Sequence, residues 1–134
     1  MKRSSYLKRK TKLAKKRKVR SQREILRDKA WDVFSLYIRT KANFTCYTCP
    51  AKGGITNAGH FWHGVLDFDE ENIKCQCVRC NKWLSGNLAV YGAKLLNEIG
   101  EERFKALDIR HTMAMKGEKH DESYYQEIID KYSL

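Results

Sequence analysis

The sequence predicts an α+β protein in which a small zinc-knuckle core is flanked by helices and preceded by a basic N-terminal arm. Two C-x-x-C pairs, separated by 27 residues (50–76), predict the knuckles. Apolar residues at spacings of three and four on both sides of these pairs predict the helices. A chain of 134 residues is expected to form one domain with an appendage. It can bury only a limited apolar area, so a bound metal ion would help to stabilise the fold.

The arm holds the whole net charge of +11. Residues 1–20 contain eleven Lys and Arg and no acid, whereas the other 114 residues contain sixteen residues of each sign. Such a run repels itself, so we expect it to be flexible in isolation or to continue the following helix on an anion. It favours nucleic acid, because each neutralised phosphate releases counterions; a solvated tail, a targeting address or an anionic membrane are weaker alternatives. The cations expected to contact nucleic acid are Lys8, Arg9, Lys10, Lys12, Lys15, Lys16, Arg17, Lys18 and Arg20.

Three segments are expected: the arm (1–21), a core domain with its own N-terminal helix (22–110), and a C-terminal linker and helix (111–134). The first helix is predicted from Gln22 to about Thr40. Residues 42–58 are expected to form a loop or tight hairpin, because Pro50 and a Gly pair interrupt them. Residues 60–68 have the aromatic and β-branched content of a strand. Helical patterns return over residues 87–100, with Gly100 as the end, over 101–111 as a short helix, and over 121–134, where Asp121 or Ser123 can provide the cap.

The cysteine spacing predicts a metal site. Cys46 and Cys49, with Cys77 and Cys80, can supply four thiolates at tetrahedral angles, and zinc is the usual occupant. We expect one structural Zn²⁺ per chain, because four sulfur ligands leave no open position; buried or redox-active cysteines are the alternative. The fifth cysteine, Cys75, does not form a knuckle and is interpreted as a small buried hydrophobe.

The polar residues around the knuckles carry a resemblance. His60 in "AGHF", then Asn72, then Asn81 directly after Cys80 resemble the HNH nuclease pattern, the ββα-metal active site built on a treble-clef zinc fold. More specifically, residues 44–108 share the run "AGHF…N…QC..CN….GN…Y…L….G" with the phage NinG/Rap recombination proteins. This resemblance implies a metal-dependent nuclease that acts on branched recombination intermediates, such as Holliday junctions, in phage recombination or replication.

The same resemblance implies roles for single residues. His60 matches the base that takes a proton from water, and Asn72 matches the Asn that steadies the histidine loop. Asn81 matches the Asn that binds the catalytic metal in the similar phage junction-resolving endonuclease VII, which implies Mg²⁺ or Mn²⁺ here, because hard cations accept amide oxygens. Arg79 and Lys82 flank this position and are expected to contact phosphate.

Gly59 departs from many HNH enzymes, in which an Asp or His at this position binds the metal. The second metal ligand is therefore unassigned, with His63, Asp67 and Asp69 as candidates in the same loop. For His63 a metal ligand, a DNA contact and a plain surface or packing residue all stay open; in an extended segment it would point away from His60. Asp67, Asp69, Glu70 and Glu71 otherwise form a solvated acidic loop. Trp62 and Trp83 could either stack on unpaired bases or pack in the core. His111 and His120 are expected to lie in a polar linker and to have no role in the site.

The cysteine spacing predicts a zinc-stabilised protein, and the resemblance implies an HNH-type endodeoxyribonuclease whose partner is branched or single-strand-containing DNA. The alternative is a non-catalytic zinc-finger DNA-binding recombination accessory protein, which would need neither His60 nor Asn81. Junction resolution usually requires two active sites, so a homodimer is expected. No apolar run approaches the roughly 18 residues that cross a bilayer, and no apolar signal segment follows the basic N-terminus. A soluble protein of the host cytoplasm without a membrane partner is therefore expected.

Overall fold

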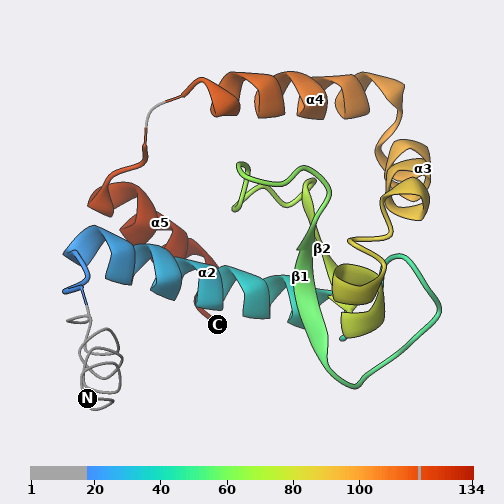
Figure 1. Cartoon of the computed structure of the whole chain (residues 1–134), viewed down its shortest axis with the longest axis horizontal. Helices are drawn as coiled ribbons and strands as arrows, with labels where there is room; N and C mark the ends of the chain where they lie inside the picture. Colours follow the sequence, from blue (N-terminus) through green and yellow to red (C-terminus); the bar gives the residue numbers. More distant parts are fainter. Residues whose placement is uncertain (1–17, 118) are drawn as a thin grey trace, which may run out of the picture.

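The computed structural model describes residues 18–117 and 119–134 (Figure 1). The arm cations predicted at positions 8–17 lie outside these residues. The mixed α+β class is confirmed, because four α-helices and one short π-helix surround a two-stranded antiparallel sheet within the described part. The elements in chain order are α2 (Gln22–Lys41), β1 (Thr56–His60), β2 (Ile73–Cys77), the π-helix η1 (Arg79–Trp83), α3 (Leu88–Ile99), α4 (Glu101–Met115) and α5 (Glu122–Tyr132).

Helix α2 starts where its local sequence provides a cap. The Ser21 hydroxyl accepts the N–H of Glu24 at 3.2 Å, and the Glu24 carboxylate accepts the N–H of Ser21 at 2.9 Å. This reciprocal pair satisfies two N–H groups that the first helical turn leaves free. The predicted helix is confirmed, and its inner face buries Ala30, Phe34 and Ile38.

The sheet packs one of its faces on α2. Strands β1 and β2 pair from Thr56 opposite Cys77 to His60 opposite Ile73. Their alternating residues Ala58, Ile73 and Cys75 join Phe34 and Ile38 of α2 and Tyr132 of α5 in one buried cluster. Because side chains alternate along a strand, His60 is on the α2 side of the sheet and Gly59 on the opposite side.

The strand predicted over residues 60–68 is wrong, because the pairing ends just after His60. The Phe61 N–H still reaches the backbone carbonyl of Asn72 at 2.9 Å, but the Trp62 N–H bonds to the Asn72 side chain instead, at 2.7 Å. Positive φ angles at Leu66 (59°) and Gly64 (88°) then turn the chain away from the sheet. The observed strand, "TNAGH", occupies the end of the segment predicted as a loop.

The loop after β1 lies between α2 and α4 (Figure 1). Phe61 and Trp62 from this loop pack on a second buried cluster, formed by Tyr91 and Leu95 of α3 and Leu107 of α4. Helix α4 is longer than predicted and ends at Met115, so the expected boundary between residues 110 and 111 falls inside it. The linker assigned to His111 is likewise wrong: the residue is helical.

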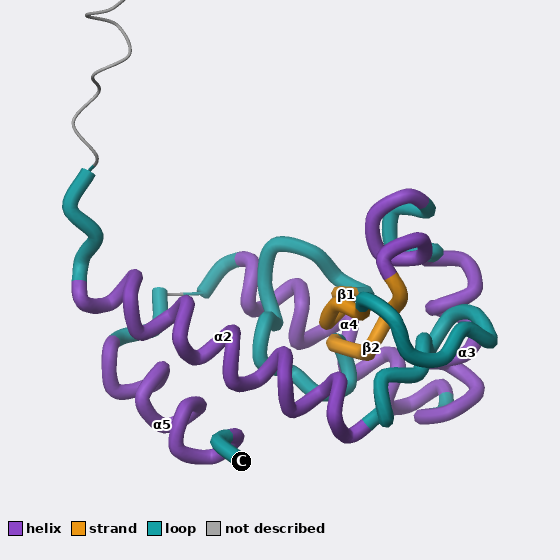
Figure 2. Tube along the Cα trace, turned by 90° about the horizontal axis from the view of Figure 1, so that it is seen from below, coloured by secondary structure: helices purple, strands orange, loops and turns teal. Residues whose placement is uncertain are grey.

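Helix α5 runs beside α2 and closes the first cluster (Figure 2). Asp121 provides its cap by accepting the N–H of Tyr124 at 2.9 Å, which decides between the two predicted capping residues. Its inward residues are Tyr125, Ile129 and Tyr132. Across the described ranges, none of the helices combines the length and the apolar character that crossing a bilayer requires.

Candidate functional site

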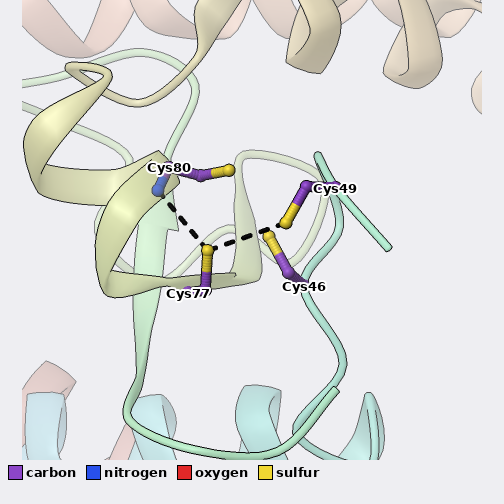
Figure 3. A group of neighbouring side chains, drawn as sticks. All are labelled: Cys46, Cys49, Cys77 and Cys80. Carbon is purple, nitrogen blue, oxygen red and sulfur yellow. Dashed lines mark hydrogen bonds between the residues drawn. The ribbon is translucent and has the colours of Figure 1, made fainter. Parts of the chain in front are cut away.

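The four predicted knuckle cysteines converge (Figure 3). The sulfur atoms of Cys46, Cys49, Cys77 and Cys80 all lie within 4.8 Å of one another, and those of Cys49 and Cys77 are 3.7 Å apart. Tetrahedral zinc with Zn–S bonds of about 2.3 Å holds its sulfurs about 3.8 Å apart. The donor set and its spacing therefore fit a zinc ion.

Hydrogen-bond donors surround the cluster. The Cys80 N–H points to the sulfur of Cys77 at 3.5 Å, and the amide of Asn87 points to the sulfur of Cys80 at 3.8 Å. Burial raises the pKa of the Cys46 thiol, but hydrogen bonds with Cys77 and Thr48 outweigh burial and lower the pKa to about 6. Such donors favour a thiolate, which is the form that binds metal.

The Cys49 thiol behaves in the opposite way. A hydrogen bond with the Ala51 backbone lowers its pKa, but burial and three sulfur neighbours raise the pKa to about 12. Four thiols this close cannot all ionise without a counter-charge, so a divalent cation is what would complete the cluster. Cys75 is separate: its side chain belongs to the core cluster against α2, and burial raises its pKa.

His60 lies at the other end of the hairpin from the cysteines. Its ring stacks on Trp31 of α2, with centroids 5.2 Å apart and planes 19° apart. Its Nε2 lies 3.0 Å from a carboxylate oxygen of Asp67. The hydrogen bond to His60 holds the pKa of Asp67 below its ordinary value. With Nε2 bound in this way, the neutral imidazole offers Nδ1 as its proton acceptor.

His63 stacks on the outer side of His60, with ring centroids 5.7 Å apart. The expectation that the two rings point away from each other is wrong, because it required an extended chain and the strand ends at His60. His63 is exposed, so its three interpretations now concern a residue beside His60.

The sheet register separates the cysteine cluster from His60. Cys77 is opposite Thr56, and His60 is four residues further along β1. At about 3.4 Å per residue this places the two ends roughly 14 Å apart. A zinc ion held by the cysteines is therefore too far away to bind a water molecule that His60 could activate.

The Asn72 side chain holds the loop that carries His63 and Asp67 by hydrogen bonds to its backbone. It is fully buried, and its amide oxygen accepts the Trp62 N–H at 2.7 Å. Its amide nitrogen donates to the carbonyls of Trp62, at 3.0 Å, and Leu66, at 3.2 Å. One side chain thus provides hydrogen-bond partners for three backbone groups that the sheet no longer pairs.

Gly59 has a structural reason to be glycine. A Cβ atom added there would lie 1.9 Å from the side-chain oxygen of Gln76, which is far inside van der Waals contact. Gln76 is fully buried, and its amide nitrogen donates to the Thr48 hydroxyl at 3.0 Å and the Gly86 carbonyl at 2.8 Å. Gln76 therefore occupies the space that a side chain at position 59 would need.

The acidic loop is not simply solvated, because most of its carboxylates have cationic partners. Asp69 bonds to Arg110 of α4 at 3.0 Å, and Glu70 to Lys41 of α2 at 3.0 Å. Glu71 pairs with Arg103 at 3.3 Å. Of the three candidate metal ligands in this loop, Asp69 is occupied by Arg110, Asp67 faces His60, and His63 stacks on the same ring.

The remaining predicted residues are on or near η1. Asn81 is half-buried, and its side chain forms no hydrogen bond with residues 18–117 or 119–134. Arg79 and Lys82 are exposed and have no ion-pair partner in that part of the chain. Apart from the cysteines, no three His, Cys, Asp or Glu side chains of the described residues converge on one ion.

Of the arm cations, Lys18 is exposed, and Arg20 pairs with Asp28.

Two residues of this region were not predicted from sequence. Trp31 supports the His60 ring, but it lies just off the apolar stripe of its helix, and no local pattern marks it. Gln76 belongs to the "QC" of the run shared with the phage recombination proteins, so its position in a motif was visible. Its contact with Gly59 depends on the strand register, which the sequence does not reveal.

Comparisons with known proteins identify the family. The family model described as Bacteriophage Lambda NinG protein matches residues 1–133. The protein ninG of Escherichia phage 933W is 35% identical over 91 residues, which cover 61% of this chain and 44% of the relative. The protein ninG of Escherichia phage lambda is 33% identical over 91 residues, or 61% and 43%, and that of Enterobacteria phage H19B is 39% identical over 71 residues, or 47% and 35%. The matched part thus covers less than half the length of these relatives. No solved structure matches. The chain belongs to the NinG protein family of bacteriophage lambda.

Proposed function

We propose that this protein is a metal-dependent DNA endonuclease in which His60 is the general base. The observation that carries the proposal is the contact between His60 Nε2 and the Asp67 carboxylate, 3.0 Å long, at one end of a hairpin whose other end carries the cysteine cluster. The order of cysteine pair, hairpin, second cysteine pair and short helix supports a ββα-metal site in a treble-clef arrangement.

The contacts of His60 suit proton transfer. With Nε2–H donated to Asp67, the Nδ1 lone pair is free to take a proton from a water molecule. The carboxylate then stabilises the imidazolium that forms, as an orienting carboxylate does beside other catalytic histidines. Stacking on Trp31 limits rotation of the ring, and the three hydrogen bonds of Asn72 hold the loop that carries Asp67.

The catalytic cation is part of the proposal. Mg²⁺ or Mn²⁺ would neutralise charge on the scissile phosphate, and Asn81 offers an unengaged amide oxygen on η1 to hold it. A hard cation of this kind keeps several waters and accepts phosphate oxygens, so it does not need a full cage of protein ligands. Asp69 is a poor second ligand, because Arg110 already binds its carboxylate.

The proposed substrate is DNA with branched or single-stranded parts, and recombination intermediates are the proposed biological source. Arg79 and Lys82 are exposed cations next to Asn81 and would contact the DNA backbone. The basic arm would add affinity that depends on salt but not on sequence. A homodimer would allow two strands of a junction to be cut together.

A cleavage panel tests the proposal. Zinc-loaded wild type, His60→Ala and the control His120→Ala are compared on four-way junction, flap, hairpin, single-stranded and plain duplex DNA with Mg²⁺ or Mn²⁺. We expect His60→Ala to bind DNA and zinc normally but to cleave about 100-fold more slowly or worse, because it removes the base. His120→Ala removes an exposed imidazole that stacks on Tyr124 and is expected to cleave normally. Equal cleavage by wild type and His60→Ala would overturn His60 as the general base. DNA binding without any cleavage by wild type would favour the non-catalytic zinc-finger alternative.

A further inference from the structure

Trp83, the last residue of η1, exposes 80% of its surface. Tryptophan is highly buried on average in folded proteins, so an isolated exposed indole is informative. The other two tryptophans have aromatic partners, since Trp31 stacks on His60 and Trp62 stacks on His111 at 4.6 Å. Trp83 has no such partner among the described residues.

The surroundings of Trp83 are cationic. Arg79 and Lys82 lie on the same five-residue helix, both are exposed, and neither forms an ion pair within residues 18–117 and 119–134. No acid lies in η1. Arg79 precedes Trp83 by four residues, and this spacing in a helix brings two side chains to nearly the same face. An aromatic face beside unpaired cations suits a nucleobase and its phosphates.

The helix that carries Trp83 is fixed at both ends. Cys80 is fully buried in the cysteine cluster. After the helix, the Gly86 N–H donates to the Cys80 carbonyl at 2.9 Å, and the Gly86 carbonyl accepts the Gln76 amide at 2.8 Å. The indole is therefore presented on a preformed support, which reduces the entropy lost on binding.

The same contacts place Trp83 near His60. A Cβ atom added at Gly86 would lie 3.9 Å from the His60 carbonyl oxygen. Trp83 is three residues before Gly86, and three residues span at most about 11 Å. The backbone of Trp83 is thus within roughly 17 Å of the His60 carbonyl, which is a span of about five stacked bases at roughly 3.4 Å each.

We propose that Trp83, with Arg79 and Lys82, forms a binding site for an unpaired nucleobase of DNA. The base stacks on the indole face, and the two cations hold the neighbouring phosphates. This site would select DNA with an unstacked base close to the scissile phosphate, such as a bulge or a branch point, over continuous duplex. The inference deepens the proposed function by naming the feature of the substrate that is read, but its binding step does not require hydrolysis.

Binding to matched DNAs tests the site. Two labelled duplexes of the same sequence are used, one fully paired and one with a single-nucleotide bulge, and affinity is measured by fluorescence anisotropy without added Mg²⁺ or Mn²⁺. We expect Trp83→Ala to weaken the affinity for the bulged DNA about tenfold, which is a typical loss for one stacking aromatic side chain. Its affinity for the paired DNA should fall by less than about twofold. Trp83→Phe should retain most of the preference, and the control Leu84→Ala, which trims the adjacent exposed apolar residue, should retain all of it.

The cations have a separate readout. Arg79→Ala and Lys82→Ala are expected to weaken the binding of both DNAs equally and to reduce the slope of affinity against salt. The reason is that these two side chains would contact phosphates instead of a base. Zinc content and circular dichroism of each variant report whether the fold is kept; Trp83 is exposed, so its replacement removes no core packing.

Several outcomes would overturn the site. One is that Trp83→Ala weakens the affinity for both DNAs equally, and another is that it weakens neither. A third is that Trp83→Phe prefers the bulged DNA no more than Trp83→Ala does. His60→Ala separates this inference from the proposed function. If His60→Ala and wild type both prefer the bulge through Trp83 but wild type cleaves nothing, the base site stands and the nuclease proposal fails. If wild type cleaves and Trp83→Ala shows unchanged preference, only the base site fails.

Discussion

The two ends of the β1–β2 hairpin are held by different kinds of interaction. At one end, four cysteine sulfurs converge within 4.8 Å of one another and could hold a zinc ion. At the other end, His60 is positioned by Trp31, by Asp67 and by a loop that Asn72 holds with three hydrogen bonds. The comparison shows that one small sheet joins a cysteine cluster that could hold a zinc ion to a histidine positioned by contacts with other side chains.

The separation has a chemical benefit. Imidazole is a good zinc ligand, so a histidine close to four thiolates could compete with them for the ion. The length of the paired strands, roughly 14 Å, keeps the two chemistries apart. Substitutions that weaken one end of the hairpin at a time test this separation.

Loss of a cysteine ligand should have the largest effect. We expect Cys80→Ser to bind zinc much more weakly and to lose cooperative unfolding, since structural zinc contributes on the order of 10 kcal/mol in small domains. Metal analysis and thermal melting by circular dichroism measure both effects. Cys75→Ala is the matched control: it removes a buried thiol outside the cluster and should keep about one zinc per chain. A Cys80→Ser protein that melts like wild type would show that the cluster does not anchor the hairpin.

Asn72→Ala should damage the histidine end and leave the cysteine end loaded with zinc. The substitution strips partners from the N–H and carbonyl of Trp62 and the carbonyl of Leu66. An unpaired buried polar group costs about 1–3 kcal/mol, so we expect a loss of roughly 3 kcal/mol in the free energy of unfolding, measured with urea. Asn57→Ala, at a half-buried Asn of β1, is the control and should cost far less. Zinc loss in Asn72→Ala would mean that the two ends are not independent.

Gly59→Ala should destabilise the sheet between the two ends. The added methyl meets the side-chain oxygen of Gln76 at 1.9 Å, and overpacking of this kind costs about 1–3 kcal/mol. The cost should largely disappear in a Gln76→Ala background, where the space is free. A double-mutant cycle in urea measures this coupling, which we expect to exceed about 1 kcal/mol. Additive effects of the two substitutions would show that Gln76 does not explain the glycine.

Asp67→Asn should have the smallest effect on stability and a larger one on cleavage. The pKa of Asp67 is lowered in the folded protein, so the ionised carboxylate stabilises the fold at pH values above about 3.9, the ordinary carboxyl pKa. This contribution is lost as the pH falls through the lower, folded-state pKa. Because Asp67 is about half exposed, we expect a difference below about 1 kcal/mol at neutral pH that vanishes in acid. Urea titrations of both proteins at several pH values measure it, and a difference that grows in acid would contradict the assignment.

Some features could be predicted from sequence because they are local. The cysteine spacing and the apolar stripe of α2 each depend on residues a few positions apart. The strand β1 could not be predicted, because Ala, Gly and Asn have low β-propensity, and the segment is a strand only through its pairing with β2. The more strand-like residues that follow it form a loop, since Asn72 replaces the sheet partner of Trp62.

The candidate site divides in the same way. The four candidate zinc ligands and the candidate histidine could be named from their spacing and from the shared run. The partners of His60 could not, because Trp31, Asp67 and His63 reach it from a helix and a loop whose paths depend on tertiary packing. The filled space at Gly59 likewise follows from the register of two strands.

A metal-dependence assay tests the division of labour most directly. Wild type and His60→Ala, both carrying one zinc per chain, are given branched DNA with no added cation, with Mg²⁺ and with Mn²⁺. We expect the zinc-loaded wild type to cleave only when Mg²⁺ or Mn²⁺ is present, and His60→Ala to bind the same DNA and zinc without appreciable cleavage under any condition. Full cleavage by the zinc protein alone, or undiminished cleavage by His60→Ala, would contradict the separation of an anchoring cysteine end from a catalytic histidine end.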